Sequence, residues 1–117
     1  MTPETLAAVE AAWLKHPDSK PTGFERIGES WLVCHVAKET PAVRWGAVEN
    51  NIAEFAIVGA FVAWLGKHHE GCIAEICGEP ATENGWSVIW HRFRGGEFAN
   101  FDEATLVLAL ARAVAGV

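Results

Sequence analysis

Residues that could bind a metal ion lie close together in the middle of the chain. The run His68-His69-Glu70-Gly71-Cys72 is followed by Cys77, and imidazole and thiolate are ligands that zinc prefers. In a regular strand, residues five apart point to opposite faces, so Cys72 and Cys77 would point apart. The chain contains no Cys-x-x-Cys pair, and histidines also suit the C-terminal end of a helix. We therefore expect no metal and no cofactor here.

A thiol and an imidazole also adjoin at Cys34 and His35. Neighbours on a strand point to opposite faces, so these two residues cannot form a nucleophile and base pair by themselves. His91 is a conceivable partner from elsewhere, although nothing singles it out. We therefore favour a non-enzymatic protein. The alternative is a small enzyme or ligand-binding domain that uses His35 and His91 with a carboxylate beside the sheet.

The basic residues cluster once, in the run His91-Arg92-Phe93-Arg94. In a strand, Trp86, Trp90, Arg92 and Arg94 would share one face. That face could stack the bases of single-stranded nucleic acid, or could anchor another protein. The net charge of −6 disfavours nucleic acid. The possible interface that we predict consists of Trp86, Trp90, Arg92 and Arg94 with two aromatic residues of the preceding helix, Trp64 and Phe61.

That preceding helix, residues 48–65, is the element around which the chain is organised. It contains no basic residue, and no acidic residue follows Glu54. A helix that is apolar nearly all round must be covered on several sides, by a sheet, by other helices or by another chain. Its charge-free part, residues 55–66, is shorter than the about 20 residues that span a bilayer. We therefore predict a buried helix and no membrane partner.

The remaining elements follow from periodicity, caps and turn residues. Thr2 and Pro3 begin a helix that ends before Pro17, and Asp102 is a candidate cap for a C-terminal helix over residues 103–115. Strands are expected over residues 30–37, 72–79 and 86–94, with apolar side chains on both faces. The predicted fold class is α+β: a short, three-stranded, mostly antiparallel sheet flanked by three helices, in the order α-β-α-β-β-α.

Composition sets the domain count and the compartment. The chain has 117 residues, of which half are apolar, and this suits a single domain over residues 1–117. Three cysteines are an odd number without a disulfide framework, as expected in a reducing compartment. The N-terminal residues lack the basic start and apolar run of a secretory signal. We expect a cytoplasmic protein.

Six tryptophans and no tyrosine make the chain rich in large apolar surface. That surplus, on the central helix, on both sheet faces and on the last helix, exceeds what one thin sandwich hides. We therefore predict a homo-oligomer, most simply a dimer.

From the central helix onward the chain resembles the phage ABA sandwich family, small phage proteins in which helices flank a short antiparallel sheet. Three stretches carry the resemblance: Asn51-Ile52-Ala53 at the start of an apolar helix, Asn84-Gly85-Trp86 at the start of a strand, and Asp102-Glu103-Ala104-Thr105 followed by Leu108-Ala109-Leu110-Ala111-Arg112-Ala113. The resemblance implies a phage or prophage origin and no assigned chemistry. It also implies an accessory protein that contacts a host protein or a defence component, in the manner of anti-CRISPR proteins, inside the host cytoplasm.

Overall fold

The protein is an α+β fold in which three helices lie between two antiparallel sheets. The computed structural model describes residues 1–27, 30–36, 43–48, 50–67, 71–78 and 85–117. The helices are α1 (Pro3–Lys15), α2 (Asn50–Lys67) and α3 (Leu106–Gly116), with a 3₁₀ turn, η1 (Pro17–Ser19), after α1. The strands are β1 (Phe24–Ile27), β2 (Ser30–Val36), β3 (Val43–Val48), β4 (Gly71–Gly78), β5 (Trp86–Arg92) and β6 (Phe98–Glu103).

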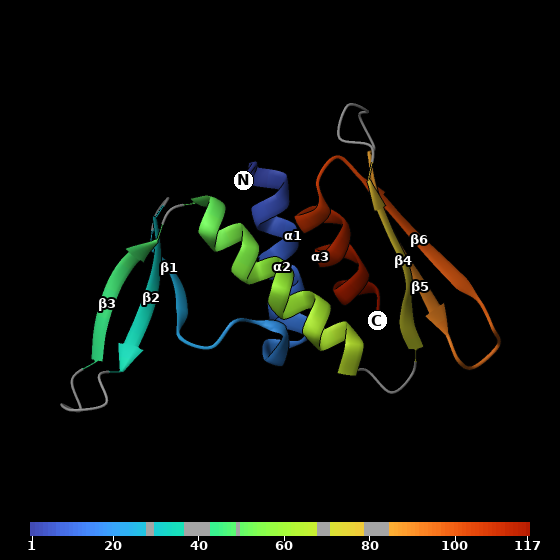
Figure 1. Ribbon diagram of the computed structural model, residues 1–117, viewed down its shortest axis with the longest axis horizontal. Coiled ribbons are helices and arrows are strands. Elements are labelled where there is room, and N and C mark those ends of the chain that lie inside the picture. The colour runs from blue at the N-terminus through green and yellow to red at the C-terminus, as the bar shows by residue number, and fades with distance from the viewer. Residues whose placement is uncertain (28–29, 37–42, 49, 68–70, 79–84) are drawn as a thin grey trace.

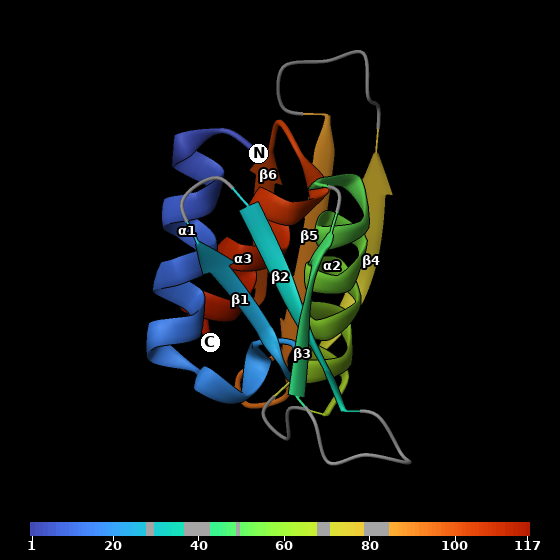
Figure 2. The same cartoon turned by 90° about the vertical axis from the view of Figure 1, so that its left-hand side faces the viewer.

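The strands form two separate three-stranded sheets. Sheet A has the order β1-β2-β3 and sheet B the order β4-β5-β6, and every neighbouring pair is antiparallel. Figure 1 shows the two sheets as outer layers with the helices between them. In Figure 2, β1 lies in front of α1 and β3 in front of α2. The α2 helix therefore lies on the side of the molecule where β3 and β4 are found, each of which is one of the two edge strands of its sheet.

The predicted α+β class, the three helices and the antiparallel pairing are confirmed. The strands expected over residues 30–37, 72–79 and 86–94 correspond to β2, β4 and β5. The structure adds β1, β3 and β6, and it places β2 in a different sheet from β4 and β5. β3 is hard to recognise from the sequence, because Gly46 interrupts its apolar pattern and α2 follows almost at once.

Two threonines cap the first and the last helix, α1 and α3. The Thr2 side chain accepts a hydrogen bond from the Thr5 backbone N–H at 3.2 Å, as expected from the sequence. At α3 the cap is Thr105, which accepts from the Leu108 N–H at 3.3 Å. The expected cap, Asp102, is wrong because residues 98–103 pair with β5 and so continue the sheet.

One hydrophobic core joins the helices to both sheets. Phe24 and Trp31 contribute to it from sheet A, and Val88 and Trp90 from sheet B. The α3 helix lies at its centre: every residue from 107 to 111 is buried, as are Ala113 and Val114. The helix that is covered nearly all round is therefore α3. In α2, by contrast, one row of residues is fully buried, its flanks are half-buried and the opposite side is exposed.

A candidate protein-contact surface on α2

The buried residues of α2 recur at helical spacing. Ala53, Ile57, Phe61 and Leu65 are all fully buried, and each lies four residues from the next. Residues at this spacing lie on one face of a helix. This row attaches α2 to the core, with contacts to α3, to β4 and to η1.

The opposite side of α2 is apolar and open to solvent. Ile52 is 53% exposed, Phe55 75% and Val62 36%. Gly59, Ala63 and Gly66 are also exposed. We call these six residues the α2 stripe: Ile52, Phe55, Gly59, Val62, Ala63 and Gly66. No charged residue occurs between Phe55 and Gly66, so the stripe lacks the charged face that a solvated helix normally carries.

The two glycines leave room above the helix. A Cβ atom added to Gly59 or to Gly66 would have no neighbour within 4 Å. Glycine weakens a helix interior by about 0.5–1 kcal/mol relative to alanine, and no described atom within 4 Å requires the small size of glycine at these two positions. The glycines instead lower the helix surface at two points along the α2 stripe.

The β4 edge beside α2 is less open to pairing than its length suggests. β4 pairs only with β5 within the described sheets, which leaves its other side as an edge. A β-bulge lies between Ile73 and Glu75, and Glu75 is exposed. Bulges and charges on an edge strand oppose the addition of another strand. Ile76 of this strand is 38% exposed.

The residues predicted as an interface do not form one surface. Phe61 is 0% exposed and Trp90 2%, so both belong to the core and neither is available to a partner. Trp64 is half-buried, with its ring 4.6 Å from that of His16. The prediction was wrong for Trp90 because the Trp-bearing face of β5 turns inward onto α3. It was wrong for Phe61 because this residue belongs to the buried row of α2.

The same burial weakens the nucleic-acid alternative. A base-stacking surface needs exposed rings beside its cations. Trp90 is buried and Trp86 is half-buried, whereas Arg92 and Arg94 are exposed near the end of β5 and in the turn that follows. The predicted stacking pair, Trp86 and Trp90, is therefore not exposed beside the arginines.

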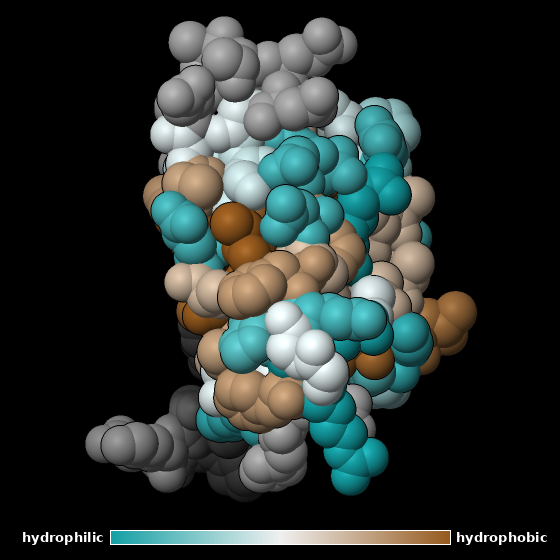
Figure 3. All heavy atoms as spheres, turned by 90° about the vertical axis from the view of Figure 1, so that its right-hand side faces the viewer, coloured by the Kyte–Doolittle hydropathy of each residue, from teal (hydrophilic) through white to brown (hydrophobic). Residues whose placement is uncertain are grey.

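His91 lies on the outer face of sheet B. Its ring stacks on Phe98 at 4.6 Å and meets Phe93 edge-on at 6.0 Å. Across the strands it faces Cys72. This face, shown in Figure 3, mixes apolar and polar side chains; its centre is Ile89, paired with Glu75 on one side and Asn100 on the other. His91 is thus placed in an aromatic cluster on the outer face of the sheet.

The two described cysteines share a face, which corrects the sequence-based expectation. Cys72 pairs with His91 and Cys77 with Ser87, and both partners point outward from the alternation of β5. The bulge between Ile73 and Glu75 absorbs one residue and so returns Cys77 to the face of Cys72. Among the described residues, no three His, Cys, Asp or Glu side chains gather where they could hold a metal. His68, His69 and Glu70, and the side chains of Cys34 and His35, lie outside the described part of the chain.

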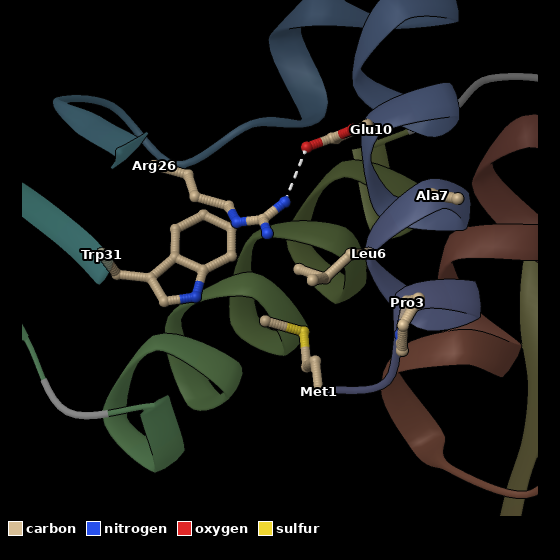
Figure 4. A pocket seen from close by; sticks show the side chains of 7 residues that line it. All are labelled: Met1, Pro3, Leu6, Ala7, Glu10, Arg26 and Trp31. Carbon is tan, nitrogen blue, oxygen red and sulfur yellow. Dashed lines mark hydrogen bonds and ion pairs between the residues drawn. The ribbon is translucent and has the colours of Figure 1, made fainter. Parts of the chain in front are cut away.

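A cavity of about 520 Å³ opens between α1 and sheet A (Figure 4). Its charged groups are Arg26 and Glu10, whose Nη1 and Oε1 atoms form an ion pair at 3.1 Å. Each charge is thus already compensated, and no histidine or cysteine is among the described residues that line the cavity. The described lining residues are Met1, Pro3, Leu6, Ala7, Glu10, Arg26 and Trp31. These residues give the enzyme alternative no nucleophile, and their one carboxylate is paired with Arg26.

The fold and its surface define a small α+β domain that exposes an apolar helix stripe. None of the described helices is long and apolar enough to cross a bilayer. Comparisons of the chain with protein-family models, with curated proteins and with solved structures find no match. The resemblance to the phage ABA sandwich family therefore stays a prediction.

Proposed function

We propose that this chain is a non-enzymatic protein that acts by contact with another protein chain, through the α2 stripe. The observation that carries the proposal is the exposure of Ile52, Phe55 and Val62 on a helix face without charge. Apolar surface of this kind is found at protein contacts, because a soluble monomer gains nothing by exposing it. Phe55 is the natural anchor, since a large exposed aromatic ring loses the most water-accessible area when a partner covers it.

The biological setting follows from the resemblance alone. A phage or prophage accessory protein would meet its partner in the host cytoplasm, and the partner would be a host protein or a defence component. The net charge of −6 agrees with a protein partner better than with nucleic acid, whose phosphates repel an acidic surface.

Site-specific photo-cross-linking in bacterial cells tests this proposal. A p-benzoylphenylalanine residue at position 55 should give discrete cross-linked adducts. The matched control is the same residue at position 14, because Leu14 is 86% exposed on α1 and lies outside the α2 stripe. Adducts at position 55 that are absent at position 14 support the proposal. Absence of adducts at position 55, with the chain folded and abundant, would refute it.

A further inference from the structure

We infer that the α2 stripe is covered by the α2 stripe of a second copy of this chain, with the two helices antiparallel about a two-fold axis near Gly59. The inference rests on the proposed function, because it names the partner of the same surface. It goes further in fixing the direction of the helices and the residues that face one another.

The spacing of the stripe suits a helix as its partner. Ile52, Phe55, Gly59, Val62 and Gly66 follow one another at intervals of three, four, three and four residues. This is the repeat with which two helices keep a common seam in contact along their length. Ala63 lies beside that seam and is also exposed.

The sizes of the side chains select the antiparallel direction. The two largest residues, Ile52 and Phe55, lie at the N-terminal end of the stripe, and the smaller residues Val62, Ala63 and Gly66 lie at its C-terminal end. A parallel pair would set bulk against bulk and leave a gap at the other end. An antiparallel pair sets the bulk of each helix against the small residues of the other, and close packing favours that match.

The positions also agree with two-fold symmetry. Ile52 lies seven residues before Gly59 and Gly66 lies seven residues after it. With Gly59 near the axis, Ile52 faces the second copy's Gly66, and Phe55 faces its Val62 and Ala63. The open space above Gly59 and Gly66 is then the space that the second helix occupies. An interface of this type is self-complementary, as closed two-fold dimers require.

The size of the surface sets the expected strength. Stable interfaces bury about 800 Å² per partner. The stripe from residue 52 to residue 66 is about 21 Å long at 1.5 Å per residue, and a single helix of this length supplies roughly half of such an interface. We therefore expect a reversible dimer that forms in the micromolar range rather than a permanent one.

Sedimentation equilibrium of the full chain across the micromolar range, with three variants, tests the inference. Gly59→Leu fills the space at the axis; in the single chain it has room and replaces a weak helix former. We expect it to raise the dimer dissociation constant at least about tenfold without lowering the melting temperature. Phe55→Glu should likewise raise the dissociation constant without lowering the melting temperature. Leu14→Glu should leave the dissociation constant unchanged.

Two results would overturn the inference: a monomer at every concentration, or a dimer that Gly59→Leu leaves intact. A cross-linker at position 55 of the purified chain also tests the relative direction of the two α2 helices. An antiparallel pair gives adducts near the second copy's residue 63, whereas a parallel pair gives adducts near its residue 55. If the purified chain is monomeric while position 55 captures a different protein in cells, the second copy is refuted and the proposed function stands. If position 55 captures nothing in either setting, both fail.

Discussion

Gly71 lies directly beneath the Trp90 ring, on the neighbouring strand of sheet B. A Cβ atom on Gly71 would meet two Trp90 ring carbons at 2.7 Å and the His91 carbonyl oxygen at 2.5 Å. At the other end of β4, Gly78 has the same relation to Trp86, whose ring would meet a Cβ atom at 2.6 Å. Each tryptophan of β5 thus covers a glycine of β4, an arrangement in which an aromatic ring compensates for the missing side chain of a strand glycine.

Gly71→Ala should destabilise the fold by about 1–3 kcal/mol, because neither the backbone carbonyl nor the buried Trp90 ring can move aside freely. Urea unfolding at low protein concentration measures the change. Gly59→Ala is the matched control: its Cβ has open space, and alanine should strengthen the helix by about 0.5–1 kcal/mol. Equal effects of the two substitutions would mean that the Gly71–Trp90 packing is not formed.

Leu110→Ala should cost about 2–5 kcal/mol in the free energy of unfolding. Leu110 is fully buried in α3, where the helices and sheet B meet, so its removal leaves a cavity that cannot close. Leu14→Ala removes the same atoms from a side chain that is 86% exposed and should change the unfolding free energy by less than about 0.5 kcal/mol. Comparable losses would contradict the central position of α3.

Arg112 joins the last helix to the rest of the fold through two carboxylates. Its Nη2 lies 2.9 Å from Glu4 Oε1 on α1, and its Nε lies 2.5 Å from Glu103 Oε1 on β6. The pairs are partly exposed, so we expect Arg112→Met to cost only about 1 kcal/mol. Thermal melts at low and high salt should show that loss shrink as salt is added. A loss that is independent of salt would point to packing of the arginine stem instead.

Phe55→Glu and Phe61→Glu should differ sharply although both change a phenylalanine of α2. Phe55 is 75% exposed and Phe61 is fully buried. The first variant should remain folded, with an unfolding free energy within about 0.5 kcal/mol of the parent when dilute. The second buries an unpaired carboxylate and should abolish folding. Circular dichroism of the two purified variants separates these outcomes, and loss of structure in Phe55→Glu would contradict the exposure of the stripe.

The sequence predicted the helices well because their signals are local. Thr2 and Pro3 begin α1, and the continuous apolar run of α2 is long enough to exclude a strand. β1 and β3 were not predicted because four to six residues, one of them Gly46, carry too little alternation. β6 was missed because its residues, up to Glu103, were assigned to the approach and start of the last helix.

The contact surface was harder to predict, because residue type does not tell which apolar side a tertiary neighbour covers. α2 and α3 both lack a charged stripe in the sequence, yet only α3 is enclosed. The tryptophans of β5 suggested an interface by their size, and the glycines that they cover lie on another strand. The signal that was available is the three-and-four spacing of Ile52, Phe55, Gly59 and Val62, which places three apolar side chains and one glycine on one face.

Hydroxyl-radical footprinting tests most directly whether the α2 stripe is an open surface that a second copy covers. Leu14 supplies a fully accessible reference and Phe61 a buried one. We predict that the oxidation rate of Phe55 in dilute solution lies far above that of Phe61, and that it falls severalfold as the concentration rises through the micromolar range while that of Leu14 stays constant. A Phe55 as protected as Phe61 in dilute solution, or one whose rate never changes with concentration, would contradict the account.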